Sequence, residues 1–149
     1  DLEEKTPLVT DKQAVVRTGQ GFTTEVRAGR HTFLADEPLS VGGDDLGPTP
    51  YDLLVASIGT CTSMTLRMYA DRKKWDLREI RVHLQHSKVY AEDQGHPDDK
   101  KSMIDQIERV IELEGNLDEK QRQRLLEIAD KCPVHRTLHN EIKVETRLG

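Results

Sequence analysis

The sequence has 149 residues, which is the size of one ordinary domain and is enough to enclose a single hydrophobic core. Hydrophobic residues make up 35% of the chain and charged residues 33%, with one Trp and two Phe, so the apolar supply is low for a monomer. The net charge of -5, without a basic stripe interleaved with aromatic residues, argues against nucleic acid as a partner. We therefore expect a single domain over residues 1–149 that gains buried surface at a subunit interface.

Residues 1–12 are polar and are expected to form a loose lead-in or an edge strand. Short β-prone segments separated by glycines follow them. The segments are residues 14–17, 23–27 and 31–35. Ala28-Gly29 supplies a hairpin turn before the third of them. A small antiparallel sheet is expected at the start of the chain.

A long helix is predicted after an irregular connection over residues 36–50, which contains three Gly and three Pro. Thr49 is a capping residue, Pro50 fits the first helical position, and Asp52 falls three residues after the cap. The helix should therefore begin at about Pro50. It should end near Lys73, where basic residues complement the helix dipole.

One face of this helix carries apolar and small side chains at spacings of three and four, which predicts a buried stripe. The stripe consists of Leu54, Ile58, Cys61, Thr65 and Met68. Gly59 costs roughly 1 kcal/mol relative to Ala in a helix, so a close contact with another element is expected to offset it. The charge-free run over residues 53–66 is shorter than the roughly 20 residues of a membrane span and is rich in hydroxyl groups. No membrane association is expected.

Two strands are predicted from alternating apolar and polar residues at 80–90 and 103–113, joined by a polar hairpin or loop over 91–101. The apolar faces consist of Ile80, Val82 and Leu84 in the first strand and Ile107, Ile111 and Leu113 in the second. His83 and His86 fall on opposite faces, and both are expected to be solvated. The two strands should pair.

A second helix is predicted from the capping-box spacing of Asp118 and Gln121, and Pro133 should stop it. Its apolar stripe consists of Leu125, Ile128, Ala129 and Cys132. Residues 141–148 alternate again and predict a final strand, with Ile142, Val144 and Thr146 on one side. The order of elements predicts an α+β fold, with antiparallel sheet packed against helices.

The two cysteines, Cys61 and Cys132, allow three interpretations: a structural disulfide, two buried thiols, or a reactive pair. The N-terminus shows no basic segment followed by an apolar run, so a cytoplasmic location is expected, which weakens the disulfide reading. A thiol in apolar surroundings has a raised pKa and is inert, whereas a nearby guanidinium lowers the pKa and creates a nucleophile. The neighbours of Cys61 therefore decide its reactivity.

A metal site is a further alternative, because Cys132, His135 and His139 have the spacing C-x2-H-x3-H. A structural zinc site needs four ligands, and the fourth would have to be recruited from elsewhere, for instance Cys61. We expect no metal and no cofactor.

The segments GPTPYDLLVASIGTCTSMTL and EIADKCPVHRTL, with DEPLSVGG before the first, resemble the OsmC/Ohr family of thiol-dependent peroxidases over nearly the whole chain. The resemblance implies an intertwined homodimer with an active site at each subunit interface. It implies that Cys61 is the peroxidatic residue and Cys132 the resolving one. It also implies an oxidative-stress enzyme that reduces organic hydroperoxides and is reset by a dithiol of lipoyl or thioredoxin type.

In the family's hydroperoxide reductases, an Arg from the N-terminal sheet and a Glu directly after the helix-starting Pro polarise the site. Here that position holds Tyr51, and the acid is Asp52, about 100 degrees further around the helix, where capping accounts for it. The candidate arginines are Arg17, Arg27 and Arg30, and their spacing selects none of them. The competing function is a non-catalytic protein that binds a small apolar ligand at the dimer interface.

Overall fold

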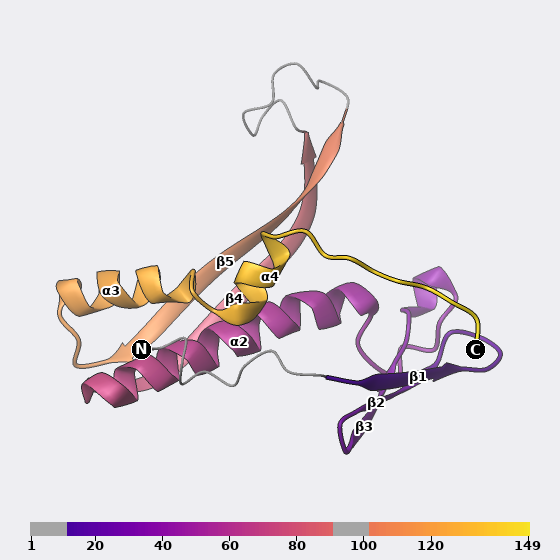
Figure 1. Ribbon diagram of the computed structural model, residues 1–149, viewed down its shortest axis with the longest axis horizontal. Coiled ribbons are helices and arrows are strands. Elements are labelled where there is room, and N and C mark those ends of the chain that lie inside the picture. Colours follow the sequence, from indigo (N-terminus) through magenta and orange to yellow (C-terminus); the bar gives the residue numbers. More distant parts are fainter. Residues whose placement is uncertain (1–11, 91–101) are drawn as a thin grey trace. The chain divides into compact units, whose positions relative to one another are not determined.

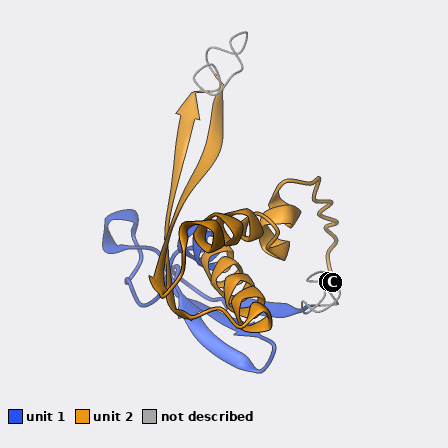
Figure 2. Cartoon of the chain, turned by 90° about the vertical axis from the view of Figure 1, so that its left-hand side faces the viewer, with its two compact units in different colours: residues 1–56 blue, residues 57–149 orange. Residues whose placement is uncertain are grey.

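The computed structural model describes residues 12–90 and 102–149, which form antiparallel sheets and helices (Figure 1). The chain groups into two compact units, residues 1–56 and residues 57–149 (Figure 2). The α+β class is confirmed. The predicted loop over 91–101 and residues 1–11 of the predicted lead-in lie outside the described residues, and the single-domain expectation stays a prediction.

The first unit contains the expected small antiparallel sheet, with strand order β1-β2-β3. Its strands are β1 (Ala14–Thr18), β2 (Thr24–Ala28) and β3 (His31–Ala35). The hairpin turn is Gly29-Arg30, one residue later than predicted, because Ala28 pairs with His31. Gly29 has a φ of +60°, which suits the first position of a type II′ turn.

The connection after β3 contains a 3-10 turn, η1 (Leu39–Val41), and is organised around Asp36, which is only 2% exposed. Its carboxylate accepts hydrogen bonds from the Thr23 hydroxyl at 2.8 Å and from the N–H groups of Glu37 at 2.8 Å and Leu46 at 3.3 Å. Burial by itself would raise the pKa of Asp36, but these hydrogen bonds together outweigh burial and lower the pKa. The predicted irregular loop is therefore held in one conformation by an ionised carboxylate.

The Asp36→Asn variant should lower the melting temperature at neutral pH, because an amide NH2 replaces an acceptor among N–H donors. The folded pKa lies below the unfolded pKa, so the stabilisation is complete above about pH 4 and is lost as the pH falls through the lowered folded value. The gap in melting temperature between wild type and variant should thus close in acid. Asp45→Asn is the control, since Asp45 is exposed and Asn tolerates its φ of 54°. A gap that does not change with pH would contradict this role.

Helix α2 (Pro50–Lys73) has the predicted bounds. The Thr49 hydroxyl accepts from the Asp52 N–H at 3.2 Å, and the Asp52 carboxylate accepts from the Thr49 N–H at 2.9 Å. This reciprocal pair confirms the predicted cap. Neither α2 nor any shorter helix in the described residues combines the length and apolarity that crossing a membrane requires.

The buried face of α2 is rotated from the predicted stripe. The buried residues are Ile58, Thr62, Thr65, Leu66, Tyr69 and Ala70. Cys61 is only half-buried, whereas Thr62 takes a buried position because its hydroxyl donates to the Ile58 carbonyl of the same helix at 2.7 Å. Gly59 has the expected close contact, since a Cβ there would lie 2.7 Å from Leu84 Cδ1.

Strands β4 (Leu77–Tyr90) and β5 (Met103–Gly115) form the predicted antiparallel pair, a long ribbon in Figure 1. Their predicted apolar faces are half-buried, which confirms the alternation. His83 is exposed, as expected. The expectation for His86 was wrong: its side chain is 18% exposed and lies 2.8 Å from a carboxylate oxygen of Asp105, because it shares the half-buried face of β4.

Helix α3 (Glu119–Ala129) begins with the predicted capping box of Asp118 and Gln121, and its predicted apolar stripe is buried. The helix ends before Pro133, and Pro133 starts a further short helix, α4 (Pro133–Leu138), which was not predicted. Pro fits the first position of a helix as well as it ends one.

The strand predicted over residues 141–148 was wrong. These residues have no regular structure, and Val144 and Leu148 are 80% and 100% exposed. Alternation decides which side chains share a face, but a strand also needs a neighbour for its backbone N–H and C=O groups. The sheets of the described chain, β1-β2-β3 and β4-β5, do not supply that neighbour.

Candidate functional site

The two cysteines meet at the start of α4, within the second unit. Cys61 Sγ accepts from the Val134 N–H at 3.5 Å, and Cys132 Sγ accepts from the His135 N–H at 3.3 Å. Both are free thiols; Cys61 is half-buried and Cys132 is fully buried. Because Val134 and His135 are adjacent in the first turn of α4, the two sulfur atoms lie at the same helix end. The structure therefore brings together the two residues that the sequence singled out.

The surroundings of Cys61 keep its thiol protonated at neutral pH. Burial raises the pKa of Cys61, and the neighbouring Cys132 thiol raises it further. Hydrogen bonds from the Val134 N–H and the Thr65 hydroxyl lower the pKa but do not outweigh burial. None of these contributions, within the part of the chain that the structure describes, comes from a cation. The geometry supplies a dithiol site, and a positive charge would still be needed to activate it.

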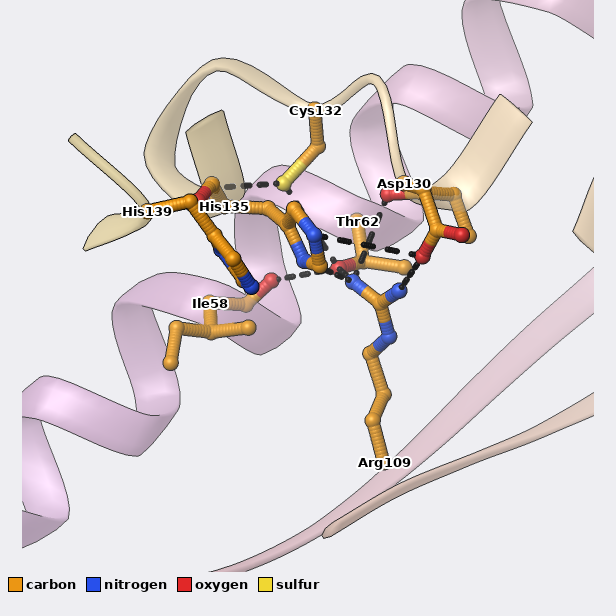
Figure 3. A network of polar contacts seen from close by, with 8 residues as sticks. Ile58, Thr62, Arg109, Asp130, Cys132, His135 and His139 are labelled. Atoms are coloured by element: carbon orange, nitrogen blue, oxygen red, sulfur yellow. Dashed lines mark hydrogen bonds and ion pairs between the residues drawn. The ribbon is translucent and has the colours of Figure 1, made fainter. Parts of the chain in front are cut away.

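Arg109 is the polar residue of this region that the sequence analysis missed (Figure 3). It rises from β5, and its Nη1 donates to Thr62 Oγ1 at 3.1 Å and to the Ala129 carbonyl at 3.3 Å. The same nitrogen lies 3.4 Å from His135 Nδ1, and Nη2 forms an ion pair with Asp130 at 2.8 Å. One guanidinium thus joins side chains and backbone from α2, α3 and α4.

A signal for Arg109 was present in the alternation of β5. Arg109 occupies the register position between Ile107 and Ile111, on the half-buried face of the strand. Its side chain is 13% exposed, whereas that of Asp130 is 68% exposed. A cation on an apolar strand face needs a specific set of acceptors, and that requirement was the available clue.

Thr62 connects Arg109 to the buried cysteine. Its hydroxyl oxygen accepts from Arg109, donates to the Ile58 carbonyl and lies 3.9 Å from Cys132 Sγ. Cys132 is therefore packed against a hydroxyl group that is itself held in place by a guanidinium.

His135 is a neutral imidazole at neutral pH. Burial lowers the pKa of His135, the Arg109 guanidinium and the neighbouring His139 lower it further, and Asp130 opposes them. Its ring stacks on that of His139, with centroids 4.3 Å apart. The Arg109 guanidinium faces Nδ1, which disfavours a metal ion there. Across residues 12–90 and 102–149, no group of three or more His, Cys, Asp or Glu side chains is placed to hold a metal, so these residues give the metal-site alternative no support.

The candidate activating arginines lie in the first unit. Arg17 and Arg27 are exposed on β1 and β2, and Arg30 is exposed in the β2–β3 turn. Exposure favours none of them over the others. Tyr51 is exposed at the start of α2, and Asp52 is committed to the helix cap.

The combination of antiparallel sheets and a long helix matches the OsmC-like fold. The chain belongs to the family described as OsmC-like protein, whose model matches residues 42–147. This confirms the resemblance found in the sequence.

Similar solved structures include an OsmC-like protein from Mycoplasma pneumoniae, at 14% identity and a TM-score of 0.69, covering 89% of each chain. An organic hydroperoxide resistance protein OsmC from Legionella pneumophila has 17% identity and a TM-score of 0.63, covering 88% of this chain and 90% of its own. An organic hydroperoxide resistance protein from Elizabethkingia anophelis has 20% identity and a TM-score of 0.64, covering 93% and 94%. At these identities the likeness shows the fold alone. No curated protein matches the sequence.

Proposed function

We propose that the protein is a thiol-dependent peroxidase that reduces organic hydroperoxides, with Cys61 as the peroxidatic residue and Cys132 as the resolving residue. The observation that carries this proposal is the placement of both thiols at the first turn of α4. Family membership supports a redox or peroxide-resistance role, and two similar structures are organic hydroperoxide resistance proteins. The placement of both thiols on adjacent N–H groups of one helix end favours this function over binding of an inert apolar ligand.

The proposed chemistry has three steps. The Cys61 thiolate attacks the distal oxygen of the hydroperoxide, the O–O bond breaks, and an alcohol leaves with a proton while Cys61 becomes a sulfenic acid. The Cys132 sulfur then attacks the Cys61 sulfur, and water leaves as the disulfide forms. An external dithiol restores both thiols and is itself oxidised to a disulfide.

Activation of Cys61 needs a positive charge that is not among the described groups acting on this thiol, whose pKa is raised by burial. We propose a homodimer in which Arg17, Arg27 or Arg30 supplies the missing positive charge. Exposed apolar side chains on β1 and in residues 141–148 support such an interface, since their burial would be favourable. The proposed setting is the cytoplasm, with a lipoyl or thioredoxin-type dithiol as reductant.

Reaction of the reduced protein with one equivalent of cumene hydroperoxide tests the proposal. We expect rapid loss of two hydrogen atoms per chain in the intact mass, and a peptide that joins Cys61 to Cys132 in a non-reducing map. The reason is that a sulfenic acid in contact with a second thiol condenses with it. If neither sulfur is oxidised faster than a free model thiol, the peroxidase proposal fails and the apolar-ligand function becomes the better one.

A further inference from the structure

We infer that Arg109 is a positioning residue for the resolving step, which it serves by holding the chain around Cys132 through Ala129, Asp130 and His135. This inference rests on the proposed peroxidase function. It assigns Arg109 to the capture of the sulfenic acid and not to its formation.

The place of Cys132 in the chain makes its position depend on Arg109. The residue lies in the short link between the end of α3 and Pro133, the start of α4. Arg109 holds both sides of this link: it binds the Ala129 carbonyl and the Asp130 carboxylate before Cys132, and it lies against the His135 ring after it (Figure 3). A planar guanidinium fixes several acceptors at once in a way that an ammonium group does not. Arg109 therefore holds the segment that carries Cys132 from both sides, in addition to the hydrogen bonds that the Cys132 backbone makes with Ala129 and Arg136.

The same guanidinium also contacts Thr62, the residue against which the Cys132 thiol packs. Arg109 donates to Thr62 Oγ1, and that oxygen lies 3.9 Å from Cys132 Sγ. Thr62 is fully buried, so its rotamer is fixed by its partners, Arg109 and the Ile58 carbonyl. Loss of Arg109 would therefore free both the segment between α3 and α4 and the Thr62 hydroxyl that lies beside the Cys132 thiol.

Arg109 has no direct effect on the peroxidatic residue. The contributions to the pKa of Cys61 come from burial, Val134, Cys132 and Thr65, and not from Arg109. Arg109 therefore does not act on the Cys61 thiol directly, and its loss should change the attack on the peroxide less than it changes the resolving step. The geometry points to a role that begins only once the sulfenic acid exists.

The chemical consequence concerns two competing fates of the Cys61 sulfenic acid. Cys132 attacks its sulfur and expels water, or a second hydroperoxide transfers an oxygen atom to give sulfinic acid and an alcohol. The first route depends on the position of the Cys132 sulfur, and a displacement of about 1 Å is enough to slow a positioned reaction by up to about a hundredfold. Arg109 thus protects the enzyme from irreversible oxidation.

The test compares Arg109→Gln, Arg109→Lys and Asp130→Asn with the wild type in the full chain. Arg122→Gln is the matched control, because Arg122 also caps carbonyl groups, those of Leu113 and Gly115 at 3.0 and 3.4 Å, and also ties α3 to β5. Each protein is treated with a series of cumene hydroperoxide concentrations. Trapping with dimedone gives the rate of sulfenic acid formation, and intact mass gives the ratio of sulfinic acid to disulfide.

For Arg109→Gln we expect the ratio of sulfinic acid to disulfide to rise about tenfold or more, and the rate of sulfenic acid formation to change much less than that ratio. Arg109→Lys and Asp130→Asn should show smaller increases, because each keeps part of the contact set. These two variants also carry the test if Arg109→Gln does not fold. Arg122→Gln should resolve like the wild type.

Three outcomes overturn the inference, and they are distinguishable. If the wild type forms neither sulfenic acid nor disulfide, the proposed function fails and the role of Arg109 fails with it. If the wild type forms the disulfide and the Arg109 variants resolve equally fast, only the positioning role fails. If Arg122→Gln raises the sulfinic acid ratio as much as Arg109→Gln at an equal loss of melting temperature, Arg109 acts through general stability alone.

Discussion

Cys61→Ser is expected to reduce the consumption of organic hydroperoxide to the uncatalysed rate. A serine hydroxyl is a far weaker nucleophile than a thiolate toward a peroxide oxygen, so the loss should be on the order of a hundredfold or more. The substitution is nearly isosteric, and the hydroxyl oxygen accepts from the Val134 N–H in place of the sulfur. The fold should therefore survive. The measurement is the decay of cumene hydroperoxide with reduced protein in the absence of any reductant.

Cys132→Ser is the matched control for that experiment. Its Cys61 remains, so it should consume a first equivalent of hydroperoxide like the wild type. It should then accumulate sulfenic and sulfinic acid in place of a disulfide. Consumption by Cys61→Ser that equals that of the wild type would exclude Cys61 as the peroxidatic residue.

Gly115→Ala is expected to produce the largest loss of stability. Gly115 ends β5 with a φ of +153°, and a Cβ atom there would overlap the backbone carbonyl oxygen of Asp76. The conformation alone costs a non-glycine residue about 1–3 kcal/mol, and a backbone overlap relaxes only if the start of β4 moves. We expect the free energy of unfolding to fall by about 3 kcal/mol or more, measured by chemical denaturation.

Gly19→Ala provides the comparison. Gly19 has no positive φ, and a Cβ atom there meets no atom within 4 Å. This substitution should change the free energy of unfolding by less than about 0.5 kcal/mol. Equal effects of the two substitutions would show that the junction of β4 and β5 tolerates a side chain.

Local chemistry accounts for what the sequence predicted well. The caps at Thr49 and Asp118 depend on residues three positions apart, so the starts of α2 and α3 follow from short stretches of sequence. The paired strands followed in the same way from alternation. The roles of Cys61 and Cys132 came from the family resemblance, and their placement at one helix end came only with the structure.

Long-range partners account for what the sequence did not predict. Arg109 depends on acceptors from three other elements, and no local pattern encodes them. The buried face of α2 was displaced because Thr62 satisfies its hydroxyl within its own helix and then packs like an apolar residue. The strand predicted over 141–148 has the right alternation, but its neighbour is not supplied by the sheets of the described chain.

The first turn of α4 has an evolutionary consequence. Cys132 occupies its N-cap position, where Ser, Thr, Asp or Asn would be the stronger cap, since sulfur is a weak acceptor. Selection for helix stability alone would therefore favour replacement of this thiol by an oxygen-bearing side chain. On the proposed function, the reactivity of Cys132 as the resolving residue explains why this position holds a thiol in place of a stronger cap.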